Sequence, residues 1–287
     1  MREVSSRTGL APVTLARIAD PALLRQAWRR VRANQGGPGG DGVRLEAFAE
    51  GLDSEIERLA SSLANRSYRP GPLRRCAIPK PDGGERWLAI PCVRDRVVQS
   101  ATLMVLQPFL EARQSAASFA YRPARGVSDA LAAVRQAHAS GLIWTLEADI
   151  VHYFDSIPHN RLLAELTIWI EAEEVLRLIA LWVDGFSKER RGVAQGAPIS
   201  PLLANLFLHP LDRLLVASGH VPVRYADDFV VLAESAAAVE RARHIAAGIL
   251  RDRGLALKPA KTLMVAPGTP FRFLGETLCA PTHLRLQ

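Results

Sequence analysis

The sequence predicts an α+β fold that contains an antiparallel sheet. Candidate strands and helices follow one another without the strict alternation that a doubly wound parallel sheet requires. Two pairs of strand-like segments are joined by short turn sequences, as in antiparallel β-hairpins, and they span residues 74–90 and 221–232. The 287 residues suffice for one large domain or two ordinary ones.

The composition excludes several classes of protein and favours a polyanionic partner. Hydrophobic residues make up 48% of the chain and charged residues 23%, as in ordinary soluble globular proteins. Lys and Arg number 36 against 29 Asp and Glu, and the net charge of +7 suggests nucleic acid as a partner. The N-terminus has no signal-peptide pattern, and no run approaches the ~18 apolar residues of a membrane span. The three cysteines form no C-x-x-C pair, which argues against a zinc site and fits a reducing cytoplasm.

The first elements along the chain are expected to be two helices and a hairpin. Helices are predicted over residues 21–33 and over 44–64, where apolar residues recur at helical spacing. The glycine-rich segment 34–42 between them is a loop, and no Gly-Lys-Ser/Thr follows to make it a Walker-type phosphate site. Strands at 74–79 and 86–90 then flank the turn sequence PDGG.

This first hairpin is basic, and two interpretations of it stay open. One is a ribbon whose charges are merely solvated, and the other is a finger that binds phosphate groups. Its basic residues are Arg74, Arg75, Lys80 and Arg86.

The rest of the chain mixes helices and short strands. A helix over 93–112 precedes one that is expected to be capped at Ser128. The remaining predicted elements are a strand at 143–151, a helix or helix pair over 160–184, a helix from Pro201, the second hairpin, a helix at 235–253 and short strands to the end.

The second hairpin carries two adjacent aspartates at its tip, in HVPVRYADDFVVLAES over residues 220–235. Asp suits turns because its side chain bonds its own backbone and tolerates unusual dihedral angles. The alternative is a divalent cation, since hard cations such as Mg²⁺ prefer oxygen ligands. A third carboxylate from elsewhere would favour the cation.

The strand WTLEADIVHYFDSI, residues 144–157, supplies such a carboxylate. Apolar residues alternate with Thr145, Glu147 and Asp149, so a period of two places Asp149 on the face opposite the apolar set. From there Asp149 could meet Asp227 and Asp228 across a neighbouring strand. Three carboxylates in this arrangement suit a two-metal site for phosphoryl transfer.

Several blocks of the sequence resemble reverse transcriptases. YADD at 225–228, DIVHYFDSI at 149–157 and QGAPISPLLANLFL at 195–208 are similar to the palm of that family in order and approximate spacing. The blocks that resemble the group II intron branch are NQGGPGGDGV, YRPGPLRRCAIPK, ERWLAIPCVRDRVVQ, SFAYRPARGVSDAL, GLALKPAKT and FRFLGETL. The resemblance covers residues 30–278 and implies a right-hand polymerase with fingers and an antiparallel palm sheet backed by helices.

The resemblance also implies an activity and its metal ligands. The chain is expected to be an RNA-directed DNA polymerase that adds deoxynucleotides to a primer 3′-end. It implies that Asp149, Asp227 and Asp228, with the backbone carbonyl of Ile150, hold two Mg²⁺ ions, for which Mn²⁺ can substitute. Asp155 is expected to brace the structure rather than to bind metal.

Further roles come from the same resemblance. Lys261 matches a lysine that is expected to protonate the pyrophosphate leaving group. Phe154 is the expected sugar gate, which favours deoxynucleotides because its ring would collide with a 2′-hydroxyl, whereas Tyr153 belongs to the core. The residues expected to contact the incoming nucleotide are Lys80, Arg86, Phe154, Gln195, Gly196 and Tyr225. Those expected to face the nucleic-acid backbone are Arg74, Arg75, Arg122 and Arg125.

The expected organisation departs from that of intron-encoded relatives. We predict an N-terminal helical extension over 1–34, fingers and early palm over 35–125, palm over 126–278 and a tail over 279–287, with the thumb absent or minimal. The expected partners are an RNA template with a DNA or RNA primer, deoxynucleoside triphosphates, and a CRISPR integrase or another protein that supplies thumb-like contacts. No membrane partner is expected, and the expected location is the prokaryotic cytoplasm.

Several biological roles remain open at this stage. A domesticated role in CRISPR spacer acquisition or phage defence is favoured, and a group II intron-encoded fragment is the alternative. A non-catalytic RNA-binding scaffold and a primase-like or template-independent polymerase are further alternatives.

Overall fold

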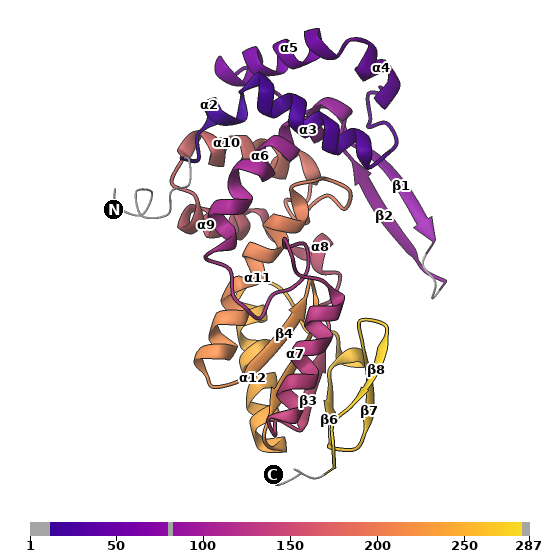
Figure 1. Cartoon of the computed structure of the whole chain (residues 1–287), viewed down its shortest axis with the longest axis vertical. Coiled ribbons are helices and arrows are strands. Elements are labelled where there is room, and N and C mark those ends of the chain that lie inside the picture. The colour runs from indigo at the N-terminus through magenta and orange to yellow at the C-terminus, as the bar shows by residue number, and fades with distance from the viewer. Residues whose placement is uncertain (1–11, 80–82, 283–287) are drawn as a thin grey trace. The chain divides into compact units, whose positions relative to one another are not determined.

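The structure is a computed structural model that describes residues 12–79 and 83–282 (Figure 1). Its contacts divide the chain into two compact units. Unit 1 comprises the chain up to Arg113 together with His159–Leu203, and unit 2 comprises Gln114–Pro158 with the chain from Ala204 onward. The two units therefore interleave along the sequence. The functional division expected at residues 35, 126 and 279 is a different one and stays a prediction.

Unit 1 is mainly helical. The first predicted helix is present as α3 (Pro21–Ala33), and the Asp20 side chain caps it by accepting from the Ala22 backbone N–H. The other described helices that lie wholly within unit 1 are α2 (Leu15–Ile18), α4 (Leu45–Glu50), α5 (Leu52–Ala64), α6 (Val93–Glu111), α9 (His159–Trp169) and α10 (Glu173–Phe186).

The prediction of one helix over residues 44–64 is wrong at Gly51. There the backbone leaves the helical region, with φ −103° and ψ 21°, and α4 ends where α5 begins. The apolar periodicity runs across this break, because a single non-helical glycine does not interrupt the sequence pattern. In contrast, the region 160–184 is the helix pair α9 and α10.

The buried helix α6 organises the core of unit 1. Asp95 in α6 is 1% exposed and accepts a hydrogen bond from the Tyr68 hydroxyl at 2.7 Å. That hydroxyl in turn accepts from the Trp182 indole N–H in α10 at 3.0 Å. The polar groups of Asp95, Tyr68 and Trp182 are thus paired with one another inside this core.

The first hairpin consists of β1 (Arg74–Pro79) and β2 (Glu85–Ile90), paired as a two-stranded antiparallel ribbon (Figure 1). Most of its residues are exposed, and Ala89 is the one fully buried residue within the two strands. The ribbon therefore gains little from core packing along most of its length.

Unit 2 contains a four-stranded antiparallel sheet with the strand order β4-β5-β3-β6. Every residue of β5 after the first is buried, so both faces of the sheet are covered. Helix α7 (Val127–Ala139) packs on β4 and β5, and α12 (Ala236–Asp252) packs on β3, β5 and β6 (Figure 1). The strands are β3 (Trp144–Ala148), β4 (Val221–Tyr225), β5 (Asp228–Ala233) and β6 (Leu263–Val265).

A hydrophobic cluster joins α7, the sheet and a last hairpin, β7 (Pro270–Phe273) with β8 (Glu276–Cys279). The helix contributes Leu131 and Val134, and β5 contributes Val230 and Leu232, which are two residues apart and share one face. The chain also forms the short helices α8 (Tyr153–Ser156) and η1 (Pro259–Lys261). Helix α11 (Ser200–Ala217) crosses from the unit 1 segment into that of unit 2.

Two helices of unit 2 have capped N-termini, and one of the caps differs from the sequence prediction. Ser235 caps α12 by accepting from the Ala238 N–H. The predicted cap at Ser128 is wrong, since α7 begins at Val127 and its N-cap is Gly126. There the Asp129 carboxylate accepts from the Gly126 N–H at 2.7 Å, which satisfies an N-terminal donor.

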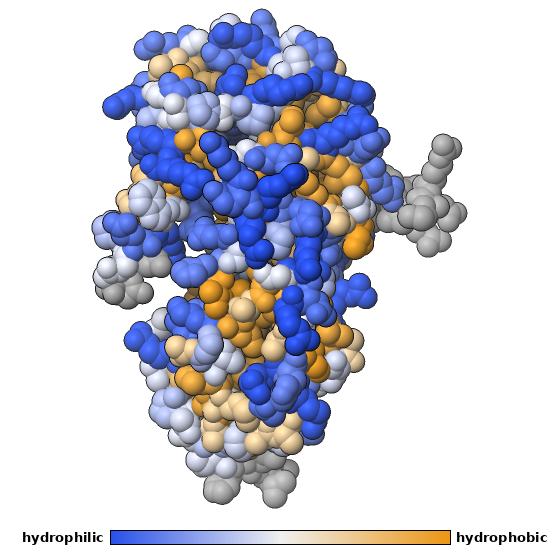
Figure 2. Space-filling model, turned by 180° about the vertical axis from the view of Figure 1, so that it is seen from behind, coloured by the Kyte–Doolittle hydropathy of each residue, from blue (hydrophilic) through white to orange (hydrophobic). Residues whose placement is uncertain are grey.

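The surface carries no membrane-spanning element among the described helices. Within residues 12–79 and 83–282, no helix combines the length and hydropathy that a crossing requires. On the face seen in Figure 2, hydrophobic side chains are exposed in separate patches among hydrophilic ones.

Candidate catalytic carboxylates and nucleotide-binding groups

The three predicted metal ligands lie at adjoining strand ends in unit 2. Strands β3 and β5 pair with Ala148 opposite Phe229, so the next residues outward are Asp149 and Asp228. Strands β4 and β5 pair with Tyr225 opposite Asp228, which leaves Asp227 in the turn between them. The sheet thus gathers acidic side chains from two segments that are distant in sequence.

The β4–β5 turn has only two residues, Ala226 and Asp227. Ala226 adopts the left-handed region with φ +60°, which two-residue hairpin turns usually fill with glycine. For a residue with a Cβ atom this conformation costs about 1–2 kcal/mol. The surrounding structure must therefore hold the turn in place.

The carboxylates interact strongly with one another. Burial raises the pKa of Asp228 to about 7, and the negative charges of Asp149, Asp227 and Glu147 raise it as well, while Lys261 opposes the shift. Burial also raises the pKa of Glu147. A cluster with these properties is stabilised by added positive charge.

Lys261 supplies one such charge. Its ammonium nitrogen lies 3.0 Å from Asp149 Oδ2, and the lysine side chain is 59% exposed while that of Asp149 is 14% exposed. The hydrogen bond to Asp149 raises the pKa of Lys261, which keeps the ammonium protonated at neutral pH. The segment 258–261 that carries Lys261 is also hydrogen-bonded through its backbone to the residue that follows β3. The Lys258 N–H donates to Asp149 O at 2.8 Å.

The same backbone contacts fix Ile150, whose carbonyl is the fourth predicted ligand. Ile150 is 2% exposed and forms a bridge with Leu257, and the neighbouring Val151 N–H donates to Ala256 O at 2.9 Å. The position of the Ile150 peptide is therefore set by residues 256–257 as well as by β3.

The donor set fits a hard divalent cation in its chemistry. It consists of carboxylate oxygens and a backbone carbonyl, which are the ligands that Mg²⁺ prefers. In the described part of the chain, no three His, Cys, Asp or Glu side chains already converge as a metal-binding group. The Lys261 ammonium balances the negative charge of Asp149. We infer that these residues could hold the cation once their charges are neutralised by it.

Phe154 and Tyr153 occupy the turn of helix that follows Asp149. Tyr153 is 2% exposed, and its hydroxyl donates to Ala204 O at 2.6 Å, so it belongs to the core as expected. Phe154 is half-buried and meets the Tyr153 ring edge-on, with ring centroids 5.8 Å apart. Tyr153 therefore supports the Phe154 ring. The predicted sugar-gate role of Phe154 stays a prediction.

In unit 1, the basic residues of the β1–β2 ribbon separate onto two faces. Ile78 pairs with Arg86, and Arg74 pairs with Ile90 four residues further along, so the period of two puts Arg74 and Arg86 on one face. Arg75 lies on the opposite face, where its guanidinium donates to Phe186 O at 3.3 Å. Lys80, the fourth predicted basic residue, lies outside the described residues.

Gln195 and Gly196 lie at the base of the same ribbon. The Ala89 N–H donates to Gln195 O at 2.7 Å. Gly196 has φ +115°, a conformation that glycine adopts readily, and a Cβ atom there would lie 3.4 Å from Ala89 O. Within unit 1, these two residues therefore lie against β2, the strand that carries Arg86. Their contact with a nucleotide stays a prediction.

The remaining predicted residues have different surroundings. Tyr225 is half-buried and packs against the hydrophobic cluster of unit 2. Arg122 is 8% exposed and donates to the carbonyls of Ser115 and Ser118, which are contacts of a structural residue. Arg125 donates to Ala116 O at 2.7 Å. Nucleic-acid binding by either arginine stays a prediction.

Two residues that matter for this site were not among those predicted from the sequence. Glu147 precedes Asp149 by two residues on the same face of β3, and the alternation that located Asp149 would have located it too. Arg224 is fully buried in β4 and bonds the Asp227 turn through Ala226 O. Its signal was a charged residue inside the apolar run VPVRY.

Comparison with known proteins places the chain in a family. The reverse transcriptase (RNA-dependent DNA polymerase) family matches residues 78–278. Protein YkfC of Escherichia coli strain K12 is 31% identical over 311 residues, which cover 91% of this chain and 81% of YkfC. The group II intron-encoded protein LtrA of Lactococcus lactis subsp. cremoris is 30% identical over 205 residues, which cover 68% of this chain and 34% of LtrA. The chain belongs to the reverse transcriptase family.

A solved structure supports the same fold. Telomerase from Candida albicans, in complex with a fragment of telomeric RNA, matches with a TM-score of 0.59 at 14% identity, over 83% of this chain and 49% of the telomerase chain. The predicted family and the α+β fold of fingers and palm are therefore confirmed. The prediction of a group II intron-like member agrees with the similarity to LtrA.

Proposed function

We propose that this chain is an RNA-directed DNA polymerase that extends a primer with deoxynucleotides. The observation that carries the proposal is the adjacency of Asp149 and Asp228 at the ends of paired strands, with Asp227 in the adjoining turn. In a member of the reverse transcriptase family, such a carboxylate set serves phosphoryl transfer. The family match alone would also fit a protein that has kept the fold and lost the chemistry.

The residues of unit 2 would hold divalent cations and orient the reacting groups. Asp149, Asp227, Asp228 and the carbonyl of Ile150 are the proposed ligands of two Mg²⁺ ions. When bound, such cations lower the pKa of an attacking hydroxyl and neutralise charge that develops on the phosphate. Phe154 would exclude a 2′-hydroxyl from the sugar position, and Lys261 would donate a proton to the departing pyrophosphate.

The residues of unit 1 would bind the triphosphate and the template. Arg86, with Lys80, would hold phosphate oxygens, for which the arginine fork is suited and the lysine acts as a point charge. Arg74 shares the exposed face of Arg86 and would extend this basic surface. Gln195 and Gly196 would line the nucleotide, and Arg75 would lie toward nucleic acid. From unit 2, Tyr225 would line the nucleotide, and Arg122 and Arg125 would lie toward nucleic acid.

Primer extension tests the proposal. A purified chain with an RNA template, a DNA primer, deoxynucleotides and Mg²⁺ should lengthen the primer. Asp149→Asn and Asp228→Asn should each lower the rate by at least about 10³-fold, since ligands of catalytic cations are lost. Asp155→Asn is the control because it makes the same charge change at an exposed position six residues from Asp149.

The other candidate activities give different outcomes in the same assay. A scaffold would bind RNA with no nucleotide incorporation by any variant. A primase-like or template-independent enzyme would incorporate nucleotides without primer or without template. Wild-type rates in Asp149→Asn and Asp228→Asn would contradict the proposed function outright.

For the biological setting, we propose a domesticated role in CRISPR spacer acquisition or phage defence in a prokaryotic cytoplasm. The alternative is a group II intron-encoded fragment, which the 30% identity to LtrA favours. The genes beside this one separate the two settings. A neighbouring CRISPR integrase gene supports the first, and flanking group II intron RNA supports the second.

A further inference from the structure

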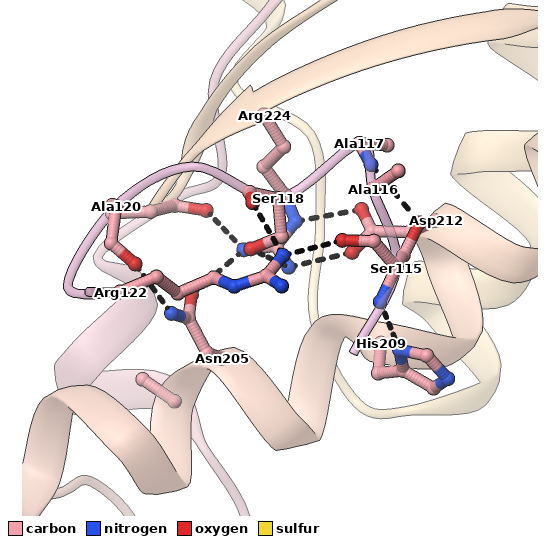
Figure 3. Close-up of polar contacts among 12 residues, drawn as sticks. Ser115, Ala116, Ala117, Ser118, Ala120, Arg122, Asn205, His209, Asp212 and Arg224 are labelled. Carbon is pink, nitrogen blue, oxygen red and sulfur yellow. Dashed lines mark hydrogen bonds and ion pairs between the residues drawn. The ribbon is translucent and has the colours of Figure 1, made fainter. Parts of the chain in front are cut away.

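Arg224 is a buried arginine in the strand that leads into the Asp227–Asp228 turn. It is 1% exposed, and its guanidinium uses all five of its N–H donors (Figure 3). Nε and Nη2 donate to the two carboxylate oxygens of Asp212 at 2.7 and 2.6 Å. The remaining acceptors are Ser118 Oγ at 3.0 Å, Asn205 Oδ1 at 3.1 Å and Ala226 O at 2.9 Å.

The bond to Ala226 acts on the turn itself. Ala226 O belongs to the peptide group that joins Ala226 to Asp227, so the bond fixes the orientation of that peptide plane. Ala226 has φ +60°, which an alanine adopts only when its surroundings hold it there. Nη1 of Arg224 is the donor that does so from inside the protein.

The guanidinium is itself firmly anchored. Helix α11 supplies Asp212 and Asn205, and Asn205 is oriented by donating its own amide to Ala120 O at 2.7 Å. The backbone of Arg224 also pairs with the segment before α7, donating to Ala117 O at 2.8 Å and accepting from the Phe119 N–H at 2.9 Å. The turn is therefore linked through one side chain to helix α11 and to the loop before α7. Figure 3 shows Arg224 with its partners Asp212, Asn205 and Ser118.

A simple buried ion pair does not account for this arrangement. The fork of Nε and Nη2 is enough for the pair with Asp212, and such pairs contribute little net stability compared with apolar residues of similar size. Nη1 bonds two other acceptors, Asn205 Oδ1 and Ala226 O. Of these two bonds, the one to Ala226 O acts on the turn, and the one to Asn205 Oδ1 holds Nη1 in place.

We propose that Arg224 is a positioning residue: through Nη1 it holds the Ala226–Asp227 peptide so that Asp227 and Asp228 are presented together for cation binding. This rests on the proposed function for its consequence in catalysis. The positioning itself is a property of the folded chain and is measurable without substrate.

The central variant is Arg224→Lys, which keeps a positive charge beside Asp212 but cannot reach the acceptors in the arginine's fork geometry. Amide hydrogen exchange at residues 225–229, measured by mass spectrometry, should become at least about tenfold faster than in the parent, the loss that one charged hydrogen bond accounts for. Mn²⁺ binding followed by electron paramagnetic resonance should weaken by about tenfold, and the rate of primer extension should fall at subsaturating metal.

Ser118→Ala is the matched control. It removes one acceptor from the same guanidinium while leaving both Nη1 bonds in place. Exchange at residues 225–229 and the Mn²⁺ affinity should stay as in the parent. Equal changes in Ser118→Ala and Arg224→Lys would show that Arg224 serves general stability only, and would overturn the proposal.

A double variant separates positioning from stability. Arg224→Met with Asp212→Leu replaces the buried charges by apolar groups, so its melting temperature should recover relative to Arg224→Met alone. Fast exchange at the turn and weak Mn²⁺ binding should persist, because Ala226 O still lacks its donor. Recovery of parent-like exchange and Mn²⁺ affinity together with stability would refute the positioning role.

The outcomes also separate this inference from the proposed function. Loss of turn protection in Arg224→Lys, with no primer extension even by the parent chain, would leave the positioning intact and refute the polymerase. Full polymerase activity with unchanged exchange in Arg224→Lys would do the reverse.

Discussion

The two β-hairpins of this chain have opposite charge and opposite surroundings. The β4–β5 hairpin ends in Asp227 and Asp228, is part of a four-stranded sheet, and has a second strand that is almost entirely buried. The β1–β2 hairpin carries Arg74, Arg75 and Arg86, is a two-stranded sheet of its own within residues 12–79 and 83–282, and is largely exposed. The acidic groups thus sit on a packed scaffold, and the basic groups on a ribbon with few anchors.

This difference matches the demands of the two tasks proposed for them. Chemistry at a phosphate requires that the positions of the carboxylates vary by no more than a fraction of an ångström. A buried sheet, together with hydrogen bonds from neighbouring side chains, provides this precision. Binding a flexible polyanion depends on the number and sign of charges more than on their exact placement. Changes at the acidic hairpin should therefore alter rate constants, and changes at the basic hairpin should alter affinities.

After the three carboxylates themselves, the largest effect is expected at Lys261, which pairs with Asp149. Lys261→Gln should lower kcat by about 10²-fold or more, because a positioned acid contributes ~10²–10⁴-fold. The alkaline limb of the pH–rate profile should flatten in the same variant. Lys258→Gln is the control, since that residue contacts Asp149 through its backbone. Equal losses in the two variants would remove the special role of Lys261.

Phe154 should show the next largest effect. Phe154→Ala removes the ring that Tyr153 supports and should raise ribonucleotide use relative to deoxynucleotide use by about 10- to 100-fold, as steric rejection in a pocket allows. Competing incorporation of the two nucleotide types into one primer measures the ratio. An unchanged ratio would count against the sugar gate and leave Phe154 as a packing residue.

Arg86 tests the basic hairpin. Arg86→Ala should raise KM for deoxynucleotides by about tenfold through loss of a charged hydrogen bond, with a small change in kcat. Glu85→Ala, on the opposite face of the same strand, is the control. A loss confined to kcat would break the proposed division of labour between the two hairpins.

The smallest effect concerns the stability cost of the acidic cluster. The pKa of Asp228 in the folded chain, about 7, lies above the usual carboxyl value of 3.8, so the folded state binds this proton more tightly than the unfolded chain. The Asp228 contribution to stability therefore falls as pH rises from about 4 to about 7. Asp228→Asn should be more stable than the parent by on the order of 2 kcal/mol above pH 7.

Thermal unfolding in EDTA at several pH values measures this gap, which is the difference in the free energy of unfolding between Asp228→Asn and the parent. It should close below about pH 4, where Asp228 is protonated in both states. A gap of equal size at pH 3 and pH 8 would show that the asparagine acts through packing or hydrogen bonding, and that burial of the Asp228 charge is not its cause.

Much of the fold was predictable because local patterns agree with it. Alternation along residues 144–149 located β3 and oriented Asp149, and the apolar runs around YADD located β4 and β5. Two strands that bury their faces leave little freedom of register, so the adjacency of Asp149 and Asp228 followed from the sequence. Membership of the reverse transcriptase family followed from the ordered blocks.

The remaining features depend on contacts between distant segments. The pairing of Lys261 with Asp149 and the bonds from Arg224 to Asp212, Asn205 and Ala226 have no local signature. The helix break at Gly51 was hidden because apolar spacing continues through it. The Ser128 cap failed because an acidic residue three positions into the helix can serve a glycine N-cap equally well.

The interleaving of the two units has a consequence for how the protein can be taken apart. The chain departs from unit 2 after Pro158 and re-enters it at Ala204, with β3 on one side of this excursion and β4 and β5 on the other. A single protease cut therefore cannot release an intact unit 2, which carries the three carboxylates. Producing unit 2 in isolation would require joining residues 114–158 to the segment from 204 through a designed linker. During synthesis on the ribosome, its carboxylates cannot come together before residues 159–203 have been made.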